Sequence, residues 1–124
     1  MTRRFNDNPT QGSRALQIWL VLIGLAHSRQ TITYGQLAEV LGFRGAGTLA
    51  QLLGPIMFYC IQNELPPLTV LVVNRDTGLP GAGLVHADLN ADREAVFRCD
   101  WYDLVPPSPE QLKAAANAGR TSKR

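Results

Sequence analysis

The chain has 124 residues, of which 45% are hydrophobic and 18% are charged, so its composition is globular and excludes a disordered chain. This length suits a single domain, and the formal net charge of +2 does not by itself indicate a partner. The longest apolar run, residues 18–26, is far shorter than the roughly 20 residues of a membrane span, so we expect a cytoplasmic protein without membrane contact.

The first predicted helix covers residues 13–27 and follows a polar segment, residues 1–12, that we expect to be flexible. Ser13 is its candidate N-cap. Leu16, Trp19 and Ile23 recur at helical spacing and belong to a wide apolar face. A face of this width predicts burial against several other elements, so we expect this helix to be the central scaffold.

Two capping boxes predict the next two helices. Thr33 and Gln36 can exchange side-chain and backbone hydrogen bonds at the start of one helix, which Gly42 would end. Thr48 and Gln51 repeat the pattern after a loop that contains two glycines. Two short capped helices separated by such a loop are typical of a helix-turn-helix.

Pro55 predicts an interruption with a bend at residues 54–55, because proline costs about 3 kcal/mol inside a helix. A further helix would then continue to about residue 63. Residues 68–73 predict a strand, and Gly78 can take the positive φ that a turn requires. Residues 79–85 would return as an irregular edge strand, so we expect a β-hairpin wing.

Downstream, Asn90 could cap a short helix over residues 91–98, and Ser108 opens a last helix to about residue 118. We therefore expect a mainly α fold with a small β-hairpin wing, which is a winged helix-turn-helix (α+β). The winged-helix domain would cover residues 13–105, and residues 106–124 would form a C-terminal helix and basic tail.

This fold places the second helix of the helix-turn-helix in the DNA major groove. Thr48 and Gln51 supply short polar side chains for base edges, and Gly45 lets the backbone come close. Arg44 can reach a phosphate, and Arg75 stands at the expected tip of the wing. Basic residues near both ends of the chain could add phosphate contacts that do not depend on sequence.

The segment ITYGQLAEVLG, its glycine-rich loop and LTVLVVN resemble the DNA-binding domain of alkylguanine-DNA alkyltransferases and of the non-catalytic alkyltransferase-like proteins. The resemblance covers residues 31–83 and implies that Tyr34 helps to rotate a target nucleotide. The family's arginine finger is absent here or displaced to Arg44. In that family a Pro-Cys-His-Arg motif precedes a Val-Val pair. Aligning the pair with residues 72–73 places the motif on residues 68–71, and aligning its proline places it at Pro66 or Pro67. Neither alignment supplies a cysteine or a histidine. The candidate DNA-binding residues are Thr33, Tyr34, Arg44, Gly45, Thr48, Gln51 and Arg75.

We predict no catalytic residue, no metal and no cofactor, and hence no enzyme. Cys60 lies in an apolar segment and is expected to be an inert buried thiol. His86, Asp88 and Asp92 offer too few ligands for a metal site.

Double-stranded DNA, with or without a modified base, is the expected partner. Two alternatives stay open. One is a protein-interaction module that binds a partner or a second copy through Trp101 and Tyr102, if that segment is exposed, or through an apolar wing. The other is a base-flipping enzyme that uses Tyr34 and a carboxylate.

Overall fold

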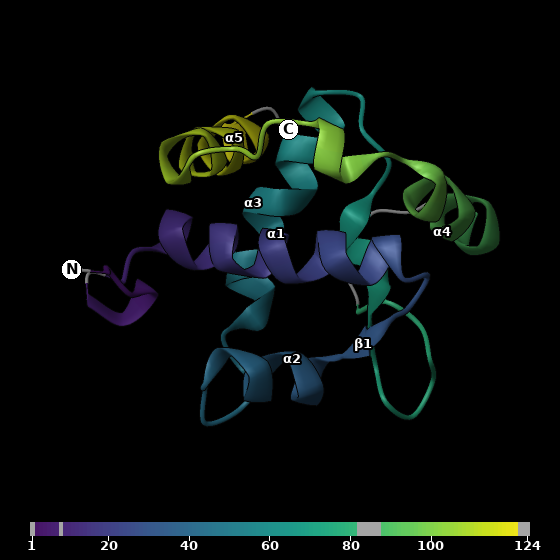
Figure 1. The fold of residues 1–124 in the computed structure, drawn as a ribbon, viewed down its shortest axis with the longest axis horizontal. Helices are drawn as coiled ribbons and strands as arrows, with labels where there is room; N and C mark the ends of the chain where they lie inside the picture. Colours follow the sequence, from purple (N-terminus) through teal and green to yellow (C-terminus); the bar gives the residue numbers. More distant parts are fainter. Residues whose placement is uncertain (1, 8, 82–87, 122–124) are drawn as a thin grey trace.

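The computed structural model describes residues 2–7, 9–81 and 88–121 (Figure 1). Its α-helices are α1 (Gln11–His27), α2 (Tyr34–Leu41), α3 (Leu49–Gln62), α4 (Leu89–Arg98) and α5 (Pro109–Thr121). Strands β1 (Ile32–Thr33) and β2 (Val72–Val73) and the 3-10 helices η1 (Phe5–Asp7), η2 (Leu68–Leu71) and η3 (Trp101–Asp103) complete the described part. The fold is mainly α with a small β component, as expected. Over the same ranges, no helix has the length and apolar content that crossing a membrane requires.

Helix α1 crosses the middle of the molecule, and α3, α5, η2 and α4 all pack against it (Figure 1). Its N-cap is Thr10, whose side chain accepts from the Ser13 N–H while the Ser13 hydroxyl accepts from the Thr10 N–H. The helix therefore begins at Gln11, before the expected cap at Ser13. A complete capping box of this kind satisfies two backbone donors at the helix start.

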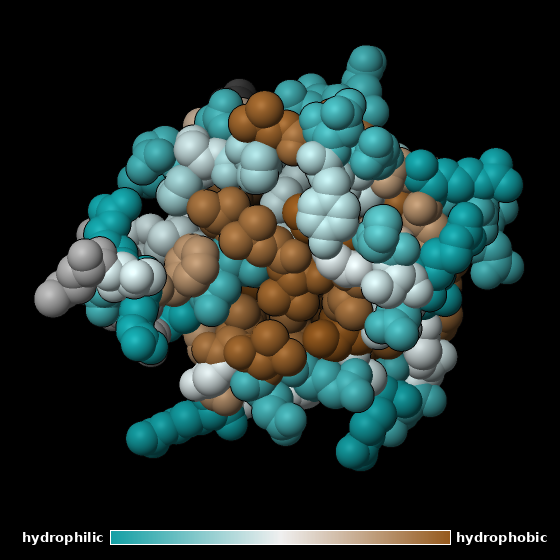
Figure 2. All heavy atoms as spheres, viewed as in Figure 1, coloured by the Kyte–Doolittle hydropathy of each residue, from teal (hydrophilic) through white to brown (hydrophobic). Residues whose placement is uncertain are grey.

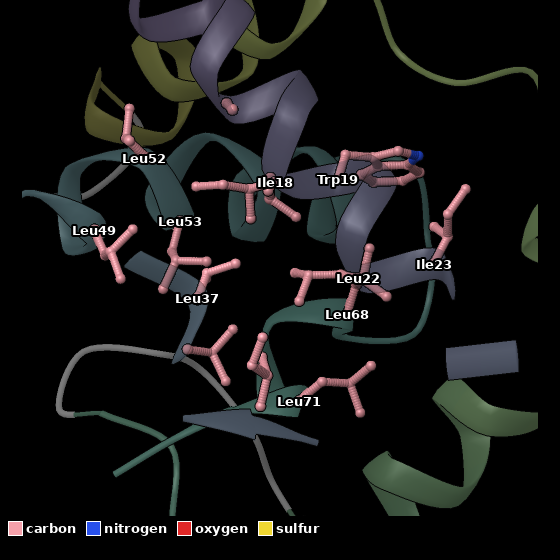
Figure 3. Close-up of a cluster of buried hydrophobic side chains, with 14 of the residues drawn as sticks. Ile18, Trp19, Leu22, Ile23, Leu37, Leu49, Leu52, Leu53, Leu68 and Leu71 are labelled. Carbon is pink, nitrogen blue, oxygen red and sulfur yellow. The ribbon is translucent and has the colours of Figure 1, made fainter. Parts of the chain in front are cut away.

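The core lies between α1, α2, α3 and η2 (Figure 3). Trp19 on α1 stands edge-on to the rings of Tyr59 and Trp101, with both centroid separations at 5.6 Å. Such edge-to-face pairs add about 0.5–1.5 kcal/mol beyond the apolar area that they bury. The large side chains with almost no exposure are Ile18, Trp19, Leu22, Leu37, Leu49, Leu53, Ile56, Leu68, Leu71 and Leu112.

Helix α2 forms as its sequence predicts. Thr33 and Gln36 make both hydrogen bonds of the capping box, at 3.1 Å each. Gly42 ends the helix in the left-handed conformation, with φ of 77°. Both signals lie within a few residues of the helix ends that they determine.

The second expected capping box, at Thr48, is wrong. The Thr48 side chain makes no cap hydrogen bond, because its backbone is already helical, with φ of −97° and ψ of −4°. A capping side chain needs an extended backbone to reach back to the first turn. The turn before α3 is instead closed by the backbone, where the Leu49 N–H donates to the Ala46 carbonyl at 3.2 Å.

The predicted interruption at Pro55 is also wrong, because α3 runs unbroken from Leu49 to Gln62. Proline has no N–H, so the carbonyl of the residue four positions earlier, Gln51, loses its helical donor. The Gln11 side chain of α1 replaces that donor, with Nε2 2.9 Å from the Gln51 oxygen. The helix thus keeps its buried proline through a hydrogen bond from a residue far away in the sequence.

The β structure differs from the expected hairpin. Only Val72 and Val73 of the predicted strand 68–73 are extended, and η2 precedes them. β2 pairs in parallel with β1, whereas the antiparallel contact in the described residues is one bridge from Val73 to Pro80. Gly78 takes the expected positive φ, at 68°, in the turn between them. Most of the expected return strand 79–85 lies outside the described residues.

The C-terminal helices cover the remaining sides of the core. The N-cap of α4 is Asp88, which accepts from the Ala91 N–H at 3.1 Å, and not Asn90 as predicted. Ser108 and Gln111 exchange hydrogen bonds at the start of α5. Helix α5 packs on α1 and α3, and a Cβ at Gly12 of α1 would collide with the Pro109 carbonyl. The segment predicted as a separate C-terminal helix thus contributes to the same core.

Candidate nucleic-acid interface

The start of α3 and the loop before it present one polar surface. Leu49 and Leu53 are fully buried and fix this end of α3 to the core. Thr48 and Gln51 are exposed on the opposite side of the helix, and Arg44 and Gly45 are exposed in the loop. Among the described residues, the side chains of Thr48 and Gln51 make no hydrogen bond within the chain. Four of the seven predicted residues therefore lie together with their polar groups toward solvent.

The other three predicted residues lie at the opposite end of α2, which has 8 residues and is about 12 Å long (Figure 1). The hydroxyl of Thr33 is used as the cap of α2. Tyr34 is partly buried, and its hydroxyl accepts from the Gly81 N–H at 3.0 Å. Burial raises the pKa of Tyr34, and the hydrogen bond from Gly81 opposes that rise. Tyr34 therefore fastens the start of α2 to the turn that follows β2.

Arg75 stands at the tip of this turn, with 87% of its side chain exposed. Its nearest carboxylate is Asp76, also 83% exposed, at an N–O separation of 3.8 Å. The turn is held from the other side by Arg93 of α4, which donates to the Gly78 carbonyl at 2.8 Å. Arg75 can thus reach a ligand on a fixed turn, although the neighbouring Asp76 reduces the net charge there.

A groove runs beside the polar surface. The sequence did not predict the α1 residues that line one side of it. The groove has a volume of about 490 Å³ and lies between the start of α1 and the start of α3. Gln11 and Arg14 contribute from α1, facing Thr48 and Gln51 of α3. Arg14 was visible in the sequence only as one basic residue near the N-terminus. Its place in the groove depends on tertiary packing that no local pattern records.

The environment of Cys60 does not support a reactive thiol. Burial raises the pKa of this thiol to about 12, so the thiolate is not populated near neutral pH. Cys99 is only partly buried, and its pKa is also raised. Thr69 is buried in η2, and its hydroxyl oxygen has no hydrogen-bond partner among the residues that the structure describes. Within the described ranges no three His, Cys, Asp or Glu side chains gather as metal ligands, and His86 lies outside them.

The chain matches no protein-family model, no curated protein and no solved structure.

Proposed function

We propose that this chain is a non-catalytic DNA-binding protein of the winged helix-turn-helix type. The exposed start of α3 enters the major groove, and the turn that carries Arg75 contacts the sugar-phosphate backbone. The observation that supports this proposal best is the α2–α3 unit. Two helices joined by a short loop bury their leucines and leave Arg44, Thr48 and Gln51 exposed together. Helices that read DNA need such short polar side chains on the face away from the core.

In this proposal, the turn after β2 is the wing. It is short, but it is anchored twice, by Tyr34 at Gly81 and by Arg93 at Gly78. An anchored turn holds Arg75 at a defined position relative to α3, so a phosphate contact there loses less conformational entropy on binding.

The proposal contains no chemical step. The protonated, buried thiol of Cys60 supports this part, because a suicide alkyl acceptor needs an accessible thiolate beside a base. We also propose a cytoplasmic location, which suits the two free cysteines, Cys60 and Cys99.

A fluorescence-anisotropy titration with a short labelled duplex tests the proposal. Gln51→Glu places a negative charge at the α3 surface and should weaken binding about tenfold at about 50 mM salt, with a steep salt dependence in the parent protein. Asn63→Asp adds the same charge at the other end of α3 and should change affinity less than twofold. Absence of duplex binding by the parent protein at this salt concentration would overturn the proposal.

A protein-interaction module is the second candidate, and the exposed apolar side chains favour it. Tyr102, Leu104 and Val105 are 61%, 37% and 88% exposed in and after η3. Hydrophobic residues also gather over α1 on the face that Figure 2 shows, within a hydrophilic surround. Self-association in sedimentation experiments, together with no binding to duplex or single-stranded DNA, would favour this function over the first.

A further inference from the structure

We propose that Tyr34 and Arg93 are positioning residues for the DNA contact of Arg75. This inference rests on the DNA binding proposed above and deepens it. It gives Tyr34 a role that differs from the nucleotide rotation implied by the family resemblance. In this role neither side chain contacts the DNA. Each one instead limits the positions that the turn carrying Arg75 can take relative to α3.

The turn of residues 74–79 has no buried side chain, because all of these residues are exposed. Hydrogen bonds within the turn close it: the Asn74 N–H donates to the Leu79 carbonyl, and the Gly78 N–H donates to the Asn74 carbonyl, both at 2.8 Å. These bonds set the shape of the turn, but neither of them reaches another element. The position of the turn on the molecule therefore depends on contacts at its two ends.

The chain enters the turn through β2, which packs in the core. Val72 is fully buried, and Val73 pairs with Thr33 of β1. Tyr34 follows Thr33 at the first position of α2, so the start of α2 lies beside the entrance to the turn. Strand pairing and apolar burial therefore fix the entering side.

The leaving side of the turn is held by hydrogen bonds from other elements, in addition to the isolated bridge to β2. Arg93 of α4 donates to the Gly78 carbonyl at 2.8 Å. The Gly81 N–H donates to the Tyr34 hydroxyl at 3.0 Å. A Cβ at Gly81 would collide with that hydroxyl, so the backbone and the phenol approach this closely only because residue 81 is glycine. Loss of either side chain would leave residues 78–81 less restrained.

Tyr34 and Arg93 are both less accessible than Arg75, which has 87% of its side chain exposed. Burial raises the pKa of Tyr34, and the hydrogen bond from Gly81 opposes this rise, so the phenol is neutral near neutral pH. Nε of Arg93 is buried and has no hydrogen-bond partner among the described residues. These two side chains act on the backbone of the turn, and holding the turn before binding reduces the ordering cost of a phosphate contact at Arg75.

A double-mutant cycle between Tyr34 and Arg75 tests the inference, with affinity for a short labelled duplex measured by anisotropy. Arg75→Gln should weaken binding about fivefold at about 50 mM salt and lower the slope of log K against log salt by about 0.9. Tyr34→Phe removes only the hydroxyl that accepts from Gly81, and should weaken binding about threefold in the parent protein. In the Arg75→Gln background it should change affinity less than about 1.5-fold, because the contact that it positions is already gone.

Each positioning residue has a matched control. Tyr102→Phe removes the hydroxyl of a tyrosine that is 61% exposed in η3, and should leave duplex affinity unchanged. Arg93→Gln removes a charge as well as a hydrogen bond, so its control is Arg98→Gln on the same helix. Arg93→Gln should weaken binding more than Arg98→Gln does in the parent protein, and equally in the Arg75→Gln background.

The mobility of the turn gives a second measurement that needs no DNA. Tyr34→Phe should lower the backbone ¹⁵N heteronuclear NOE of residues 75–78 while the rest of the spectrum stays that of the folded protein. Unchanged NOE values, or equal affinity losses from Tyr34→Phe in the two backgrounds, would overturn the inference. If Gln51→Glu still weakened binding in that case, the proposed function would survive without it. Absence of duplex binding by the parent protein would instead remove both.

Discussion

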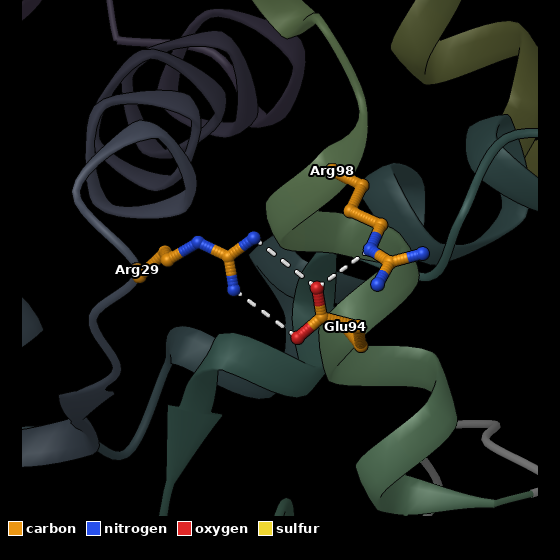
Figure 4. A network of polar contacts seen from close by, with 3 residues as sticks. All are labelled: Arg29, Glu94 and Arg98. Atoms are coloured by element: carbon orange, nitrogen blue, oxygen red, sulfur yellow. Dashed lines mark hydrogen bonds and ion pairs between the residues drawn. The ribbon is translucent and has the colours of Figure 1, made fainter.

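The two ends of the molecule hold their arginines in different ways. At the α4 end, Glu94 receives hydrogen bonds from Arg29 at 3.1 Å and from Arg98 at 2.8 Å, so one carboxylate shares its charge between two guanidinium groups (Figure 4). At the end where α3 begins, Arg44 is exposed and makes no ion pair with another described residue. An arginine that shares no carboxylate stays attractive to a ligand anion. The comparison therefore predicts that Arg44 binds phosphate and that Arg29 and Arg98 do not.

Charge reversal should give the largest difference between the two ends. Arg44→Glu removes one positive charge and adds a negative one, so duplex affinity at about 50 mM salt should fall on the order of 100-fold. Arg98→Glu makes the same change on α4 and should cost less than about threefold, through long-range repulsion only. Anisotropy titrations of both variants check this, with thermal melts to show that each remains folded. Equal losses for the two variants would abolish the distinction between the ends.

The hydrogen bond that closes the groove should have a measurable effect on stability. Gln11→Ala leaves the Gln51 carbonyl without its donor and should lower the free energy of unfolding by about 1 kcal/mol in urea titrations. In a Pro55→Ala background, the new N–H supplies that donor within α3, so the same change should cost less than about 0.5 kcal/mol. An equal cost in both backgrounds would show that Gln11 does not compensate for the proline.

The two threonines that precede α2 and α3 should also behave differently. Thr33→Ala removes the hydroxyl oxygen that accepts from the Gln36 N–H, and should cost about 1 kcal/mol of unfolding free energy. Thr48→Ala removes a side chain that makes no cap bond, and should change stability by less than about 0.5 kcal/mol. Thermal denaturation of the two variants tests this. A larger loss for Thr48→Ala would contradict the structure of the α3 start.

The smallest expected effect is the pH response of the α4 end. Arg29 and Arg98 lower the pKa of Glu94 below its ordinary value of 4.5, so the stability from this carboxylate is present above that pH and is lost as the pH falls further. Glu94→Gln should therefore slightly lower the melting temperature at neutral pH and reduce its fall in acid. Melting curves at several pH values measure this, and a steeper acid dependence in the variant would contradict the assignment.

Local signals predicted some helix ends, whereas the caps expected at Ser13, Thr48 and Asn90 are wrong. The capping box at Thr33, the helix start at Ser108 and the helix end at Gly42 involve residues only a few positions apart, and all three are present. Residues 68–71 were expected to be extended, but a short run without polar alternation on a clear second face is compatible with other buried conformations, and here it is a 3-10 helix. Continuity through Pro55 depends on Gln11, which no local pattern could reveal.

The candidate interface was predicted in part for the same reason. Exposure of Arg44, Thr48 and Gln51 follows from which residues of one short segment are apolar. The groove needs α1 to be packed against α3, so Arg14 could not be assigned to it from periodicity alone. The wing was expected from its turn residues. Strand pairing, however, depends on which strand lies alongside, and β2 pairs with β1.

NMR amide chemical-shift mapping during titration with a short DNA duplex tests the central claim most directly. The account predicts salt-sensitive shifts in the α2–α3 loop, over the first turns of α3 and in the turn that carries Arg75, with little change in η3. Shifts confined to η3 and the residues around Tyr102, or no shifts at about 50 mM salt, would contradict it.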